Sequence, residues 1–465
     1  MATFTSTGQV GTPSATPFRL TTRLISKWPF DTLPGQLALR RFIVIVASVI
    51  MLVASYNGYS LLAKVTQTVG KDAVPSIVAA EKIRTTLAYA HTNYANAFLT
   101  KEGLGGPSMK AYQSAMAEAH SSMITAAQNI TYGDEERTPI LALSTDLSQY
   151  ERLVGASFQS GTFDDSATNA DFLMRHKILA DTQALDQANF NHLNASYDSF
   201  KRSAYLWLYL ALFCALIVLL VQVESQWHAY RGFKRILNPP LLAGTAVFAL
   251  ATLFYTAQYT ANIDHLHTAK EDAFDSVHAL AKARAVAFDA NAQESIYLLH
   301  TGNASAQALV TNSFHSDALS IWASDRLGDT IPNDPNAMKG QGLLGDELAN
   351  ITFDGEKEAA TQTLNGWLDY TKIDTQIRHL EAGGQHAAAV ALDLGTSEGQ
   401  SDWAFERFDK ALQKTIDINQ SAFDTAIAAA FGGLRSMLIA VLVMFVAPVI
   451  SIIMGYRPRL AEFHE

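Results

Sequence analysis

Apolar residues gather in four long blocks along the chain, and each block is almost free of charged side chains. Each has close to the ~20 residues that a helix, rising about 1.5 Å per residue, needs to cross a ~30 Å hydrocarbon layer. The first block follows residues 1–40 and has no small-residue cleavage site after it, which argues against a secretory signal peptide. We therefore predict four retained transmembrane helices, at 41–63, 204–223, 241–260 and 433–455.

Between the blocks, apolar residues recur at steps of three or four, which indicates amphipathic helices. The clearest stripe runs from Val74 and Ile77 to Tyr94 and Ala97. Further helical runs, separated by glycine and proline, are expected at about 108–130, 139–159, from 166 into the second span, 262–301, 303–326, 355–382 and 385–432, with an irregular insertion around 328–346. No stretch alternates for long enough to predict a strand. Segments 64–203 and 261–432 are each predicted to be an antiparallel four-helix bundle that continues into the membrane.

The chain also resembles itself at a fixed offset. A shift of 226 residues aligns Asp198 with Asp424, and the pair Tyr230-Arg231 with Tyr456-Arg457. A shift of 200 residues aligns the first and third blocks and adds the identities Asp72/Asp272, Ala73/Ala273, Ser76/Ser276, Ala79/Ala279, Lys82/Lys282, Arg84/Arg284, Ala90/Ala290 and Leu99/Leu299. Alanine-rich composition could mimic part of this similarity, but two registers favour a duplication. The expected fold is an all-α membrane protein with four transmembrane helices and two bundles in tandem repeat.

Basic residues flank the blocks on one side only. They cluster in the Ser/Thr-rich segment 1–40, in the loop 224–240 and in the tail 456–465, which the positive-inside rule places in the cytoplasm. Both bundles are then extracytoplasmic, and the chain is expected to be a multi-pass protein of the bacterial cell membrane with cytoplasmic N- and C-termini. The single cysteine, Cys214, lies in a predicted span, so we expect no disulfide in either bundle.

Composition narrows the chemistry. A net charge of −10 gives no basic surface for nucleic acid, and 17% charged residues is low for a soluble domain. The string Gly395–Gly399 matches a hydrolase nucleophile elbow, but it follows an alanine-rich helical run instead of a strand. Asp264, His265, His267 and His278 lack the defined spacing of a zinc site. We therefore expect no enzyme activity, no cofactor and no metal.

Two pairs of cations lie beside the helical stripes, Lys82 with Arg84 and Lys282 with Arg284. A cation beside an apolar stripe needs an anionic partner. That partner is either an Asp or Glu of the same bundle, or the carboxylate of a ligand or the acidic surface of a partner protein. We retain all four residues as candidate ligand- or partner-binding residues.

The stretches 69–103 and 367–392 resemble the four-helix-bundle sensory ectodomains of bacterial chemoreceptors and sensor kinases. Those receptors carry a cytoplasmic signalling domain after the last span, whereas about ten residues follow it here. The whole chain resembles actinobacterial GlnX-type membrane proteins, which pair four spans with extracytoplasmic regions and link an amino-acid-binding lipoprotein to a soluble Ser/Thr kinase. The resemblance implies a periplasmic solute-binding protein and a cytoplasmic kinase as partners.

The preferred hypothesis is a non-enzymatic transmembrane signal transducer that senses a solute or a solute-binding protein and relays the signal to a separate cytoplasmic protein. The candidate output surface comprises Tyr230, Arg231, Lys234, Arg235, Tyr456 and Arg457. The two bundles are expected to pack side by side as an intrachain pseudo-dimer. The alternative is an accessory subunit that stabilises a transporter or envelope complex without switching.

Overall fold

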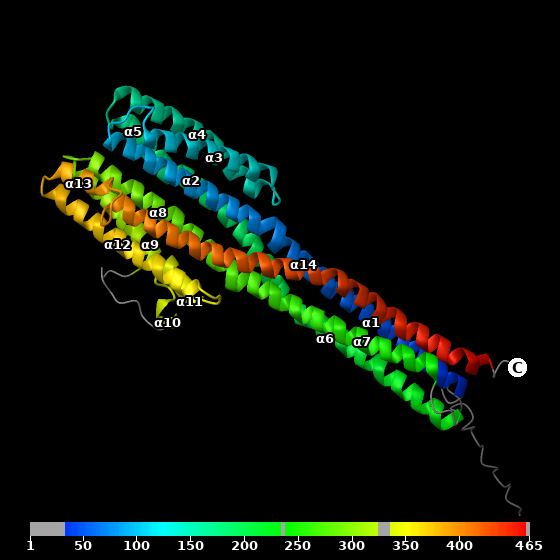
Figure 1. Ribbon diagram of the computed structural model, residues 1–465. Coiled ribbons are helices and arrows are strands. Elements are labelled where there is room, and N and C mark those ends of the chain that lie inside the picture. Colours follow the sequence, from blue (N-terminus) through cyan, green and yellow to red (C-terminus); the bar gives the residue numbers. More distant parts are fainter. Residues whose placement is uncertain (1–32, 234–237, 324–334, 462–465) are drawn as a thin grey trace, which may run out of the picture. The chain divides into compact units, whose positions relative to one another are not determined.

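The computed structural model describes residues 33–233, 238–323 and 335–461. All regular structure in these ranges is helical, and no strand occurs in them (Figure 1). The α-helices are α1 (Leu33–Gln67), α2 (Val74–Leu99), α3 (Pro107–Gln128), α4 (Asp134–Ser160), α5 (Asp165–Leu173), α6 (Leu179–Phe233), α7 (Pro239–His267), α8 (Asp275–Leu299), α9 (Ala304–Ile321), α10 (Pro335–Met338), α11 (Leu343–Ala349), α12 (Glu356–Ala382), α13 (His386–Asp393) and α14 (Ser401–Ala461). Three π-helical segments interrupt them: η2 (Thr68–Ala73), η3 (Met174–Ile178) and η4 (Thr268–Phe274).

The chain divides into two compact units, and the first contains the apolar stretches of four long helices. It comprises Met1–Val53, Ala211–Thr252 and Leu442–Glu465. Within the described residues, four helical stretches are long and apolar enough to cross a membrane: Gly35–Leu99, Asp165–His228, Pro239–Leu299 and Ser401–Arg457. Leucine, isoleucine and valine side chains on their outer faces are exposed, as in helices surrounded by lipid. The protein is therefore a membrane protein.

Polar contacts inside this first unit join helices that are distant in sequence. Gln222 donates to the Ser451 hydroxyl at 3.0 Å, and Arg40 pairs with Glu224 at 2.7 Å. Helices α7 and α14 approach closely at Gly244, where a β-carbon would lie 2.1 Å from that of Ser451. Only glycine fits at that crossing, because any side chain would push the helices apart.

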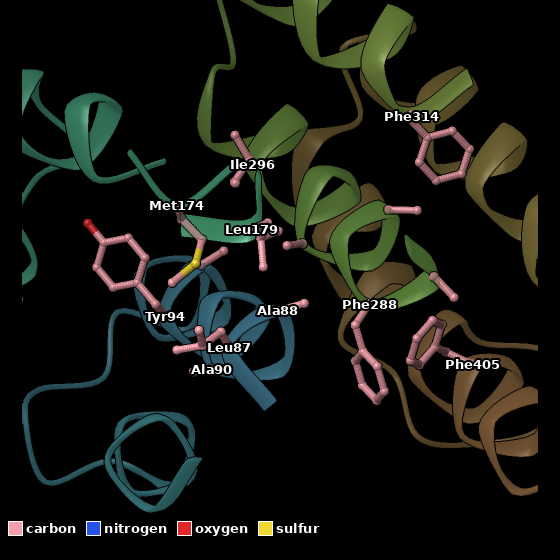
Figure 2. Packing of buried hydrophobic residues seen from close by; sticks show 14 of the residues in the cluster. Leu87, Ala88, Ala90, Tyr94, Met174, Leu179, Phe288, Ile296, Phe314 and Phe405 are labelled. Carbon is pink, nitrogen blue, oxygen red and sulfur yellow. The ribbon is translucent and has the colours of Figure 1, made fainter. Parts of the chain in front are cut away.

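The second unit comprises Ala54–Leu210 and Leu253–Val441. In it α2, α3, α4 and the α5–η3–α6 run lie side by side, and α8, α9, α12 and the first part of α14 lie together (Figure 1). Helix α2 packs along α8, so the two groups share one hydrophobic core. Figure 2 shows part of that core, where Phe288 of α8 packs edge-on against Phe405 of α14 at a centroid distance of 4.9 Å. Thr92 of α2 also donates to the Phe288 carbonyl at 3.0 Å.

Two turns in the second unit have nearly the same sequence and the same hydrogen bonds. Segment 129–132 reads Asn-Ile-Thr-Tyr and segment 350–353 reads Asn-Ile-Thr-Phe. In each, the N–H groups of the last two residues donate to one carboxylate oxygen at the start of the next helix. The acceptors are Glu136 in α4, at 2.6 Å for both bonds, and Glu356 in α12, at 2.7 and 2.8 Å. These side chains satisfy backbone donors that the helix cannot satisfy itself.

Most predicted helical runs agree with the structure, but the single run over 385–432 is wrong. The chain forms α13, leaves the helical path over 394–400 and starts again at Ser401. Gly399 adopts φ +82°, and the side chain of Gln400 accepts from the Ser397 N–H at 2.9 Å, so the loop has its own hydrogen bonds. In the predicted insertion, residues 335–338 and 343–349 are helical, while 324–334 lie outside the described residues.

Candidate functional site

A groove of about 720 Å³ runs along the second unit between α2 and α3 on one side and α8 and α14 on the other. Its apolar wall includes Ile77 and Tyr89 of α2, Val277 and Phe288 of α8, and Phe274 at the end of η4. The volume lies within the range of small-molecule sites, which are mostly apolar with a few placed polar groups. The groove therefore has the size and lining to accept a small molecule or part of a partner protein.

Two of the four predicted cations line this groove. Lys82 pairs with Glu118 of α3 at 3.0 Å, and both side chains are more than half exposed. Arg284 donates two hydrogen bonds to Asp409 of α14, at 2.6 and 2.9 Å, and a third to Gln413 at 2.6 Å. The two-bond geometry matches the planar guanidinium to the carboxylate and fixes Arg284 on the groove wall.

The other two cations lie nearer the interior. Lys282 of α8 pairs with Asp186 of α6 at 3.1 Å. Arg84 lies 3.8 Å from Glu81 in the same helix, beyond hydrogen-bond distance. All four cations thus have a carboxylate partner inside the second unit, which is one of the two alternatives left open by the sequence. A role in binding a ligand or partner remains a prediction.

A buried cluster that the sequence did not predict lies beneath the groove, where Glu81, Asp186 and His278 meet. One donor atom from each lies within 4.8 Å of the others. The His278 Nε2 atom is 2.7 Å from Asp186 Oδ1, whereas neither oxygen of Glu81 has a hydrogen-bond partner. The imidazole lies parallel to the Phe274 ring, with interplanar angle 8° and centroid distance 5.8 Å, and is 4.4 Å from the Phe190 ring. These rings orient His278 toward the carboxylates.

The electrostatics of the two carboxylates differ. Burial raises the pKa of Glu81 to about 7; Arg84 and Lys282 oppose that shift, and Asp186 adds to it. Burial would also raise the pKa of Asp186, but the hydrogen bond with His278 and the charge of Lys282 outweigh it and lower that pKa. Asp186 is therefore charged and partnered, while Glu81 is the less satisfied of the two.

A second buried acidic cluster lies in the α8 group. Glu294 is fully buried, and burial together with the charges of Asp393 and Asp374 raises its pKa well above the ordinary value. Ser401, the first residue of α14, donates to Glu294 at 2.5 Å, and Arg378 binds Asp374 through two hydrogen bonds at 2.8 and 3.0 Å. The cluster joins α8, α12, α13 and α14 where the predicted run 385–432 breaks.

The remaining sequence candidates are dispersed or only partly described. His267 lies near Glu271 and Asp272, at 3.4 and 3.5 Å, and His278 points to Asp186 instead, so the His-rich stretch does not form one cluster. In the output surface, Tyr456 is buried and donates to Ser225 at 2.5 Å. Tyr230 and Arg457 are exposed, the Arg231 side chain is not described, and Lys234 and Arg235 lie outside the described residues.

The missed residues carried a sequence signal. Asp186 interrupts a stripe of buried positions that includes Leu185 and Leu193, and Glu81 lies between Ala80 and Ile83, which are also buried. A carboxylate on an apolar helix face needs a partner. The sequence offered no means of pairing residues that lie 105 or more positions apart and belong to different helices.

Comparison with known proteins yields a match over one part of the chain. No curated protein and no solved structure is significantly similar to it. The matched part extends from the end of α1 through α2, α3, α4, α5 and η3 into the first half of α6, and thus includes the helix that carries Glu81 and the helix that carries Asp186. Residues 65–198 match the family model of the actinobacterial sensor domain.

Proposed function

We propose that the protein is a non-enzymatic transmembrane signal transducer of the bacterial cell membrane. The observation that carries the proposal is the position of the sensor-domain match. It begins inside α1 and ends inside α6, and both helices continue without a break into stretches apolar enough to span a membrane. A movement of the sensor region therefore has a direct helical route into the bilayer.

The second half of the chain is proposed to be a second copy of this sensor. In support, η2 and η4 begin 200 residues apart, and the two Asn-Ile-Thr turns are capped by glutamates in the same way. Tyr150 in α4 and Tyr370 in α12 each follow the capping glutamate by 14 residues, and both are fully buried. Two extracytoplasmic four-helix bundles, packed through α2 and α8 as an intrachain pseudo-dimer, account for these pairs.

The groove between the two copies is the proposed input site, for a solute or for a solute-binding protein. Contacts that bridge α2 or α3 to α8 or α14 would change how the copies pack, and α14, like α6, continues into an apolar stretch. The output is proposed to be read by a separate cytoplasmic protein such as a kinase, through the 224–240 loop and the last residues of the chain.

One observation favours a second candidate, an accessory subunit that does not switch. Every predicted binding cation already has an internal carboxylate partner. Such pairing is typical of a structural network, in which breaking a pair costs stability.

An insertion in α6 distinguishes the two functions. A short Gly-Ser linker between Ser203 and Ala204 would interrupt the helix between the sensor region and the apolar stretch, because such linkers are flexible. An all-alanine insertion of about two turns, which keeps helix and phase, is the matched control. If the protein relays a signal, cells with the Gly-Ser variant should show the phosphoprotein pattern of a deletion strain, and the alanine control should not. An accessory subunit should tolerate both insertions.

A further inference from the structure

The cluster of Glu81, Asp186 and His278 is not accounted for by helix packing alone. The three residues come from α2, α6 and α8 and are all buried, and Glu81 and His278 also line the groove. The Glu81 side chain is 98% buried, yet both of its oxygens lack a hydrogen-bond partner, as does Oδ2 of Asp186. A buried carboxylate without a donor is costly, so the site selects for something that supplies positive charge.

Nearby cations satisfy only part of the cluster. Lys282 contacts Asp186 on the oxygen that faces away from His278, because Nζ lies near Oδ2 while the imidazole Nε2 lies near Oδ1. Arg84 stays 3.8 Å from Glu81 and makes no hydrogen bond to it. Glu81, Oδ1 of Asp186 and Nε2 of His278 therefore face one another without a shared cation.

We propose that Glu81, Asp186 and His278 bind one divalent transition-metal ion of the Zn²⁺ class. One imidazole nitrogen and two carboxylate oxygens form a donor set that suits Zn²⁺, which takes His and Asp or Glu ligands in four-coordinate sites. The fourth position faces the groove, which is also the entry path for the ion. The ion replaces the hydrogen bond between His278 and Asp186 and provides the partner that Glu81 lacks.

The surroundings fit a metal ligand set in two further respects. Ligating side chains are held by neighbours that fix their orientation. Phe274 and Phe190 hold the His278 ring, and Lys282 holds the outer oxygen of Asp186. The bound ion would link α2 and α6, within the matched sensor domain, to α8 outside it. This inference does not depend on the proposed signalling function.

The test uses the full-length chain in lipid nanodiscs and Zn²⁺ in competition with a chromogenic chelator. We expect one Zn²⁺ per chain at this site, and a loss of affinity of about 100-fold or more in Glu81→Gln and in His278→Gln. Glu81→Gln is a mild change, because Glu81 makes no hydrogen bond that the amide would lose. Lys282→Met, which leaves all three ligands, should weaken binding by no more than about 10-fold.

A matched control is present on α3 and α4, where His120 and Glu151 form an exposed pair at 3.0 Å. His120→Gln should leave the affinity unchanged if the buried cluster is the site. Visible absorption of Co²⁺ bound in place of Zn²⁺ gives a second readout and should disappear in His278→Gln. The proposal is wrong if the wild type does not compete for Zn²⁺, or if correctly folded Glu81→Gln and His278→Gln variants, checked by far-UV circular dichroism, bind it as well as the wild type does. Since this assay measures binding alone, its failure would leave the signalling proposal standing.

Discussion

Replacing Glu347 by Gln should make the protein less sensitive to alkaline pH. Glu347 lies in α11 and is 99% buried, with one oxygen accepting from Asn419 at 3.3 Å and the other unpartnered. Burial raises the pKa of its carboxyl to about 8; neighbouring Glu356 adds to the shift, and Ser276 and Asn419 oppose it. The folded protein therefore holds a proton on Glu347 that the unfolded chain releases at neutral pH.

The sign and size of the effect follow from proton linkage. A carboxyl whose folded pKa exceeds its unfolded value stabilises the fold fully below the unfolded pKa, and that stability is lost as pH rises through the folded pKa. With a folded pKa of about 8 against the ordinary value of 4.5, the loss is about 1.4 kcal/mol per pH unit between them. Between pH 6 and pH 8 the wild type should therefore lose about 2 kcal/mol through this group.

The Gln variant keeps the shape and the ability to donate to Glu356, but it cannot ionise. Urea unfolding of the full chain in detergent, followed by tryptophan fluorescence at pH 6 and pH 8, measures both proteins. Asp317 and Asp402, whose pKa values burial raises to about 7, contribute equally to both and cancel in the comparison. Glu118→Gln, in which the residue replaced is about half exposed, is the control and should behave as wild type. An equal loss of stability with pH in wild type and Glu347→Gln would refute the reasoning.

Three further predictions concern topology, packing and the groove. Alkaline-phosphatase fusions should be active after residues 130 and 330 and inactive after 232 and 465; activity at either of the latter would end the proposed topology. Asn96→Cys with Ser295→Cys, in a Cys214→Ser background, should cross-link within one chain on a denaturing gel, because the two native side chains lie 2.7 Å apart; cross-links only between chains would contradict the packing of α2 on α8. Arg284→Ala should lower the free energy of unfolding by about 1–2 kcal/mol, as it strands a partly buried Asp409, whereas Lys82→Ala should cost about 0–0.5 kcal/mol; equal urea midpoints for the two variants would show that the Arg284 pair adds no stability.

Hydropathy and periodicity were sufficient for much of the fold. The four apolar blocks recur as four helices able to span a membrane, and the run predicted at 355–382 is the helix Glu356–Ala382. Both signals are local, because they depend on residues within one or two helical turns of each other. The break at 394–400 escaped prediction because the alanine-rich residues before it continue the helical pattern, and Gly395 and Gly399 were interpreted as a minor irregularity.

The site was harder to predict because it depends on distant pairs. Arg284 was identified as a cation needing a partner, but its partner, Asp409, lies 125 residues away on α14. His278 was grouped with its sequence neighbours, although it meets Asp186, 92 residues earlier on α6. Sequence periodicity shows which face of a helix is buried, and it does not show which helix lies against that face. The chain alone could therefore nominate residues but could not assemble them.

The π-helical segments η2 and η4 have a consequence for how the two halves diverged. They begin at Thr68 and Thr268, 200 residues apart, whereas the Asn-Ile-Thr turns lie 221 residues apart. On the proposed duplication, the second half lengthened only beyond α8, in the stretch that holds α10 and α11, and the junctions between span and sensor kept their residue count. A π turn takes one more residue per hydrogen bond than an α turn, so any change of length there would rotate everything that follows. Thr68 and Thr268 are therefore equivalent splice points, at which one half's span can be exchanged for the other's with the helix phase preserved.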